Sequence, residues 1–119
     1  VKAWSYKTEK IINTNLQFCG LIMGDHSKCG INTMFNTGTV VGVNANIFGG
    51  DFPPKFIPSY AWGGKQGFET YHIDKSFAVA EKVMERRRKK LTQKDKKILT
   101  AIFELSSKYR NNSANFTVS

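Results

Sequence analysis

A six-residue repeat between residues 21 and 50 is the feature that most constrains how this chain can fold. The stretch reads LIMGDHSKCGINTMFNTGTVVGVNANIFGG, and an apolar residue opens each six. Gly or Asn usually comes second, and a small residue usually stands three places later. Such hexapeptide repeats are typical of β-helices, in which each six forms a short strand and a corner. The opening residues are Met23, Cys29, Phe35, Val41 and Ile47.

The repeat predicts a parallel β-helix, in which three sixes return the chain one rung higher, about 4.8 Å away. The opening residues would point inward, and Gly or Asn would relieve the backbone where the chain turns. A run of β-hairpins with Gly turns is the less favoured interpretation. The matched sixes make only about two rungs, and repeat arrays need about three units to be stable. We therefore expect the rungs to stack on further rungs, on the C-terminal helices or on other copies.

The remaining sequence divides the chain into four segments. Residues 1–50 are predicted to hold the β-helix rungs, after an opening strand, polar turn and second strand in residues 1–16. Residues 51–73 contain all three prolines and are expected to be irregular but well packed. Residues 74–110 are predicted to form a two-helix extension, and residues 111–119 a loose tail.

Capping residues define the two predicted helices, at residues 74–90 and about 93–109. Asp74 or Ser76 can cap the first helix. Thr92 and Asp95 form a T-x-x-D start that resembles a capping box for the second. The predicted apolar faces are Phe77, Ala80, Val83 and Met84 in the first helix, and Ile98, Leu99, Ile102, Leu105 and Tyr109 in the second.

Length and composition favour one packed domain. The chain has 119 residues, 40% of them hydrophobic and 13% aromatic. It contains no run of eighteen apolar residues and no visible signal peptide, so we expect a cytoplasmic protein without a membrane partner. Cys19 and Cys29 are expected to be reduced thiols, with Cys29 pointing inward. Because the chain begins at Val1 with a strand-like stretch, we expect it to be part of a longer protein.

The net charge of +9 is concentrated in one segment. Residues 75–97 contain ten Lys or Arg and three acidic residues, which leaves a net charge of +7 there. The run ERRRKK, residues 85–90, could hold phosphate of a cofactor or of nucleic acid. No aromatic residue is interleaved with this run. We favour a solvated helix end, and nucleic acid is not an expected partner.

Two longer stretches resemble a known family. LQFCGLIMGDHSKCGINTMFNTGTVVG, followed by NIFGGDFPPKFIPSYAWGG, looks like the C-terminal part of a sugar nucleotidyltransferase-like family. Its members resemble the bifunctional N-acetylglucosamine-1-phosphate uridylyltransferase/glucosamine-1-phosphate acetyltransferase, and the Bacteroidetes-type branch looks closest. The resemblance implies a left-handed parallel β-helix that forms homotrimers and transfers an acetyl group from acetyl-CoA to a sugar-phosphate amine. It covers nearly the whole chain.

The resemblance also implies positions for ligands. Ile31, where the family usually has a small residue, and Gly49 fall at positions that contact acetyl-CoA in the family. Lys2, Lys7 and Lys10 come from the segment in which the family places lysines near the sugar phosphate. The family's nucleotidyltransferase domain and its upstream catalytic histidine motif are absent from this sequence. We therefore expect the chain by itself to transfer little or no acetyl group.

Three further side chains are candidates for chemistry. His26 is the candidate general base, because an imidazole can accept a proton from a sugar amine at neutral pH. The alternative is that His26 binds a neighbouring turn or a partner chain. His72 is interpreted as structural. Trp62 could stack on a sugar or an adenine, although we favour a role in covering the end of the β-helix. No Cys and His spacing suits a metal.

Two functions of different classes follow. The first is a transferase of sugar-nucleotide synthesis, acting on a sugar phosphate with acetyl-CoA as donor. The second is a non-catalytic trimerisation or regulatory module for a nucleotidyltransferase. Whether the chain belongs to an enzyme stays open between them.

Overall fold

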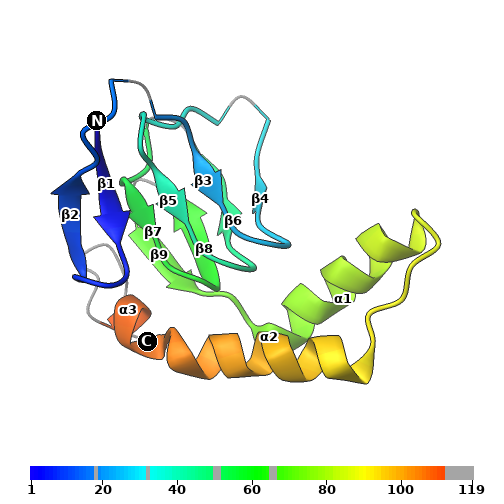
Figure 1. The fold of residues 1–119 in the computed structure, drawn as a ribbon. Helices are drawn as coiled ribbons and strands as arrows, with labels where there is room; N and C mark the ends of the chain where they lie inside the picture. Colours follow the sequence, from blue (N-terminus) through cyan, green and yellow to red (C-terminus); the bar gives the residue numbers. More distant parts are fainter. Residues whose placement is uncertain (18, 32, 50–51, 65–66, 112–119) are drawn as a thin grey trace.

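A computed structural model describes residues 1–17, 19–31, 33–49, 52–64 and 67–111. These residues form a mixed α/β fold with three small sheets of two, three and four strands, beside three helices. Figure 1 shows the three-stranded sheet in front of the four-stranded sheet, with α2 running below both. The strands are β1 (Lys2–Ser5), β2 (Lys10–Asn13), β3 (Ile22–Met23), β4 (Lys28–Cys29), β5 (Val40–Val41), β6 (Asn46–Ile47), β7 (Phe56–Ile57), β8 (Ala61–Gly64) and β9 (Gly67–Thr70). The helices are α1 (Ile73–Glu85), α2 (Gln93–Leu105) and α3 (Ser107–Asn111).

The prediction of a left-handed parallel β-helix is wrong. The described residues form small separate sheets, none of which is a solenoid. The repeat does set the first pairings, since Ile22 pairs in parallel with Val40, eighteen residues later. The next parallel pairing joins residues only sixteen positions apart, since Val40 pairs with Phe56. Residues 33–39 and 52–55 form no strand, and β9 runs antiparallel to β8, so the turns do not continue as identical rungs.

The core lies between the two larger sheets. Val41, Ile47, Ile57 and Phe68 are at most 2% exposed and belong to one apolar cluster, and Phe35 packs against it. Burying side chains of this size contributes roughly 1.5–3 kcal/mol each. The core therefore draws on the later sixes of the repeat and on residues beyond it.

The earlier sixes are exposed instead. Met23 is 37% exposed, and Cys29, which was expected to point inward, is also exposed. The reason is that, in the described part of the chain, β3 and β4 are the terminal strands of their sheets, so no further strand covers their outer side.

The segment expected to be irregular, residues 51–73, contains β7, β8 and β9. The opening strand, turn and strand are confirmed as the β1–β2 hairpin. This hairpin docks on β7 through Trp4, whose ring stacks on Phe56 at a centroid distance of 4.1 Å. Tyr109 of α3 meets Phe56 edge-on at 6.0 Å, so the β1–β2 hairpin and α3 both pack against β7.

Both helices of the C-terminal extension are present. The capping box of α2 is confirmed, since Thr92 accepts from the Asp95 amide and Asp95 accepts from the Thr92 amide. The predicted caps of α1 are wrong, because its N-cap residue is His72, whose side chain makes no capping bond. Ser76 instead donates to the Ile73 carbonyl. Most of the predicted loose tail, residues 112–119, lies outside the described residues.

Candidate functional site

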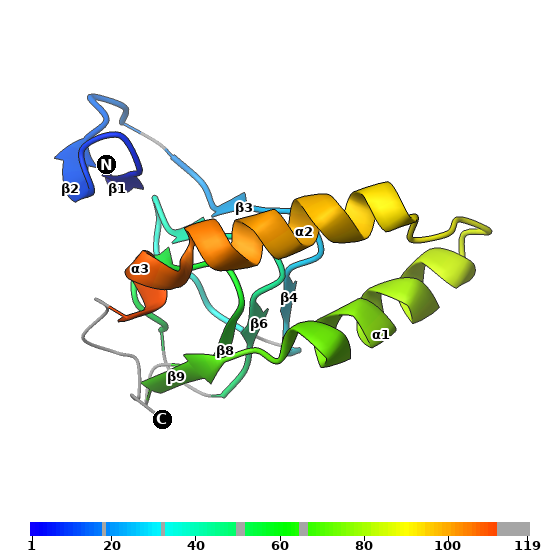
Figure 2. The same ribbon diagram turned by 90° about the horizontal axis from the view of Figure 1, so that it is seen from below.

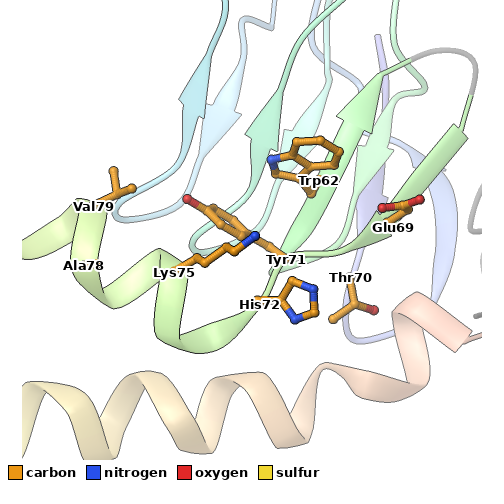
Figure 3. A pocket seen from close by; sticks show the side chains of 8 residues that line it. All are labelled: Trp62, Glu69, Thr70, Tyr71, His72, Lys75, Ala78 and Val79. Atoms are coloured by element: carbon orange, nitrogen blue, oxygen red, sulfur yellow. The ribbon is translucent and has the colours of Figure 1, made fainter.

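A pocket of about 450 Å³ lies between the four-stranded sheet and the first turns of α1. Figure 3 shows the Trp62 side chain projecting from β8, with Tyr71 and Lys75 below it. Glu69 and Val79 lie at opposite ends of the view. The pocket is lined by Trp62, Glu69, Thr70, Tyr71, His72, Lys75, Ala78 and Val79.

The alternation of β8 explains why Trp62 faces the pocket. Ala61 is fully buried and Gly63 is also buried, so the residue between them must point to the opposite face of the strand. Trp62 is 40% exposed there. At Gly63, with φ of 148°, a Cβ would overlap the Gly67 carbonyl oxygen of the paired strand. Gly63 thus permits the close β8–β9 pairing that brings Glu69 opposite Trp62.

A row of polar and aromatic residues crosses the same face of the sheet. Lys28 pairs with Asn46, Asn46 pairs with Trp62, and Trp62 pairs with Glu69. At a strand spacing of about 4.8 Å the row is about 14 Å long. It combines a cation, an amide, an indole and a carboxylate, so it can contact an extended polar ligand.

Helix α1 supplies the other wall of the pocket. The Tyr71 amide donates to the Tyr60 carbonyl at 2.6 Å, which fixes the chain where it leaves β9 for the helix. Lys75 lines the pocket from the first turn of α1, at the positive end of the helix dipole. Together they make this end of the pocket attractive to an anionic group.

Burial changes the proton equilibria of two groups at this face. It raises the pKa of the Tyr71 phenol, which keeps the hydroxyl protonated and able to donate at neutral pH. It lowers the pKa of the Lys28 ammonium group, whose Nζ donates to the His26 carbonyl at 3.0 Å. Phe48 meets Trp62 edge-on, with ring centroids 4.7 Å apart, and supports the indole from the side.

His26, the predicted general base, is not among the residues that line the pocket. It sits in the turn between β3 and β4 with a positive φ of 59° and is half-buried. Its charge helps to lower the pKa of Asp95, which places it near the start of α2. This position fits the alternative interpretation, in which His26 contacts a neighbouring segment, better than it fits a general base in an open cleft.

The other predicted ligand positions fall in two separate places. Ile31, which is 97% exposed, comes two residues after Cys29, and Gly49 comes two residues after Ile47. Cys29 and Ile47 are paired across β4 and β6. Ile31 and Gly49 therefore lie near one another at the same end of β4 and β6. Lys2 and Lys7 belong to the β1–β2 hairpin, which packs against β7. The structure does not bring these four residues and His26 together, and their roles stay predictions.

The pocket residues were mostly missed in the sequence. From the sequence, structural roles are favoured for Trp62 and His72, and Glu69, Tyr71 and Lys75 are not among the candidate ligands. The available signal was the density of polar and aromatic residues in ETYHIDK immediately before a helix. Their meeting with Trp62 depends on the β8–β9 pairing, which the sequence did not reveal.

Among the described residues, no group of three or more His, Cys, Asp or Glu side chains is arranged to hold a metal ion. Across the same part of the chain, no helix has the length and apolar character needed to cross a membrane.

Comparisons with known proteins add no relative. The sequence matches no protein-family model, no curated protein and no solved structure. The chemistry of the site therefore rests on the geometry of the pocket.

Proposed function

We propose that this chain is part of a transferase of sugar-nucleotide synthesis, and that the Trp62 pocket binds its phosphorylated sugar. The observation that carries the proposal is the exposed indole of Trp62 in a pocket that also holds Lys75 and Glu69. An indole face stacks on the apolar face of a sugar ring or on a base. Lys75 attracts phosphate, and the Glu69 carboxylate accepts hydrogen bonds from hydroxyl or amino groups. The resemblance of the GDHSK and FPPKFIPS stretches to sugar nucleotidyltransferase-like proteins supports the same substrate class.

The proposed reaction is acetyl transfer from acetyl-CoA to the sugar amine in the cytoplasm. The amine nitrogen would form a bond to the acetyl carbon while the carbon–sulfur bond of the thioester breaks. The proton released by the amine would pass through a base to the thiolate. His26 is the sequence-predicted base, but His72 lines the pocket and is the better placed imidazole.

The test is calorimetric titration of glucosamine-1-phosphate and, separately, acetyl-CoA into the purified chain. Trp62→Ala is expected to weaken sugar-phosphate binding by about 5-fold or more, the lower range for loss of one aromatic stack. Lys75→Gln should weaken binding of the phosphate but not of the unphosphorylated sugar. Lys82→Gln is the matched control, because Lys82 is exposed on the same helix and does not line the pocket. Unchanged binding in both pocket variants would contradict the proposal.

A second candidate function is assembly, in which the chain forms a homotrimer and organises a nucleotidyltransferase. An apolar groove of about 550 Å³ lies between the three-stranded sheet and helices α2 and α3. Ile22 and Leu105, which line it, are 54% and 75% exposed. Ile22 also belongs to the terminal strand β3, so a second copy could cover the groove and the adjoining strand edge.

Sedimentation at micromolar concentration tests this assembly. A trimer that dissociates in Ile22→Lys and Leu105→Lys supports it, provided that the control Ile98→Lys stays assembled. Ile98 is similarly exposed, at 51%, but lies outside the groove. A monomeric wild-type chain would contradict it.

A further inference from the structure

The connection between α1 and α2 carries a dense positive charge that nearby acidic residues offset only in part. We call residues 86–90 the basic tip; all five are Lys or Arg, and all five are exposed. The ion pairs among the described residues are Lys96 with Glu81 and Lys108 with Glu9, and neither includes the tip. Glu85 directly precedes the tip and offsets one of its five charges, while Glu81 binds Lys96 at 2.9 Å and Asp95 closes the capping box of α2.

The backbone of the basic tip turns sharply. The Lys89 amide donates to the Met84 carbonyl, and the Arg88 amide donates to the Glu85 carbonyl, each at 2.9 Å. This is the pattern of a Schellman motif, whose left-handed residue is usually Gly. Here that residue is Arg88, with φ of 57°. The turn gathers five cationic side chains around one end of the helix.

Arg88 adopts this left-handed conformation although it carries a side chain. A left-handed residue with a Cβ is less stable than Gly at the same position. Cations also favour a helix C-terminus, but that effect is confined to the last turn and does not require five of them. The five cations of the tip are therefore more than the helix end requires.

The basic tip is free to reach a partner. In Figures 1 and 2, which view the molecule at right angles, the α1–α2 connection lies beyond the strands, at the far end of the helix pair α1 and α2. A flat, extended surface could therefore contact the tip without meeting the sheets.

The chemistry around the tip favours an anionic lipid surface over nucleic acid. Residues 78–102 contain no aromatic side chain. Proteins that hold single-stranded nucleic acid use aromatic stacking, and duplex readers place a helix or ribbon in a groove. Helices α1 and α2 instead carry the exposed aliphatic residues Val83 and Ile98, whose exposed fractions are 40% and 51%. Clustered Lys and Arg with exposed aliphatic residues suit the anionic headgroup region of a bilayer.

We propose that the basic tip docks the chain on an anionic membrane surface. This departs from the expectation, drawn from the sequence, that the protein has no membrane partner. Contact of this kind is peripheral and electrostatic, so it requires no spanning helix and weakens as salt rises. The proposal is independent of the function of the Trp62 pocket, because it uses neither its residues nor its ligand.

Vesicle co-sedimentation of the full chain tests the proposal. We expect binding to phosphatidylcholine vesicles that contain roughly one-third phosphatidylglycerol, and little binding to phosphatidylcholine alone. The variant Arg87→Gln/Lys89→Gln/Lys90→Gln should lower the partition coefficient on the order of 100-fold. The matched control Lys2→Gln/Lys7→Gln/Lys10→Gln removes the same charge from the β1–β2 hairpin and should lower it far less. Raising the salt to about 1 M should release the wild-type chain.

Three results would overturn the proposal. The first is equal loss of binding in the two triple variants, which would make the effect one of net charge. The second is equal binding to neutral and anionic vesicles. The third is release of the chain from the vesicles by a duplex or single-stranded RNA at an equal concentration of phosphate, which would assign the tip to nucleic acid. Circular dichroism of each variant separates a loss of binding from a loss of folding.

Discussion

The guanidinium of Arg110 donates a hydrogen bond to the backbone carbonyl of Ser59 at 3.0 Å, across 51 residues of sequence. Arg110 also donates to the Ser106 hydroxyl at 2.6 Å and the Phe103 carbonyl at 2.8 Å. Its guanidinium lies 4.4 Å from the centroid of the Phe103 ring. Because Arg110 is only 3% exposed, this one side chain ties α3 and the end of α2 to the residues that precede β8.

Replacing Arg110 with Ala should destabilise the fold by about 3 kcal/mol, since a hydrogen bond to a charged group contributes roughly 1.5–3 kcal/mol and a buried carbonyl would lose its donor. Arg110→Lys should recover only part of that loss, because an ammonium group cannot match the planar guanidinium geometry. Urea unfolding measures both values. Arg87→Ala, at an exposed site, is the control and should change stability by less than about 0.5 kcal/mol. Equal stability of Arg110→Ala and wild type would contradict the role of this contact.

Tyr60 is the second link between the sheets and α2. Its buried hydroxyl donates to the Leu99 carbonyl at 2.9 Å and accepts from the Asn44 side-chain amide at 3.1 Å. Tyr60→Phe keeps the ring but removes the hydroxyl that binds the Leu99 carbonyl and the Asn44 amide. We therefore expect the free energy of unfolding to fall by about 1–3 kcal/mol. The measurement is thermal unfolding together with hydrogen exchange of the α2 amides, which should exchange faster. Unchanged exchange in α2 would show that the helix is held by packing alone.

The capping box of α2 predicts the effect of Thr92→Ala. The Thr92 hydroxyl accepts from the Asp95 amide at 3.1 Å, and without it that amide loses its partner. Loss of an N-cap of this type costs about 1 kcal/mol. Thr92→Ser keeps the hydroxyl and should retain most of the stability, so a large loss in Thr92→Ser would indicate a packing role for the Thr92 methyl group.

Asp95 predicts a pH dependence. Hydrogen bonds from the backbone and side chain of Thr92 lower the pKa of Asp95 from its ordinary value of 3.8. A lowered pKa means that the stabilisation by the carboxylate is complete above that ordinary value and is lost as the pH falls through the lower, folded value. The stability difference between wild type and Asp95→Asn should therefore be constant near neutral pH and shrink below about pH 4. Urea unfolding at several pH values measures it, and a difference that grows in acid would contradict the sign.

Two glycines provide a matched comparison of backbone packing. A Cβ added to Gly42 would overlap the backbone nitrogen and hydroxyl oxygen of Ser59, whereas one added to Gly20 meets nothing within 4 Å. We expect Gly42→Ala to destabilise the protein by about 1–3 kcal/mol, as overpacking does. Gly20→Ala should be neutral or slightly stabilising, because it restricts the unfolded chain. Chemical unfolding of the two variants gives the comparison, and equal effects would mean that the Ser59 segment moves freely away from Gly42.

The repeat predicted several local features correctly. Its opening residues Val41 and Ile47 are buried, as predicted. Thr39 and Ala45, the small residues that stand three places after the second position, are also buried, at 0% and 1% exposed. It failed on the architecture. Six-residue spacing sets which residues can pair, but it does not decide whether every side of each turn becomes a strand. Residues 33–39 remain outside the sheets, and β9 turns back antiparallel.

The candidate site was harder to predict than the helices. Trp62, Glu69 and Lys75 come from β8, β9 and α1, and no spacing between them signals a common pocket. From the sequence, a role for Trp62 in covering the end of the β-helix is favoured over a ligand platform, and only its 40% exposure in the pocket points to the second.

The amino-acid sequence by itself determined the local features of this protein. Side-chain periodicity placed both long helices, and capping chemistry placed the start of α2, because those interactions span only a few residues. Tertiary structure alone decided that the sheets stay small and separate and that Arg110 reaches Ser59. It also decided that a Trp, a Glu and a Lys from three elements share one pocket. Those outcomes depend on contacts between distant segments, whose free energies compete with one another and leave no local pattern in the chain.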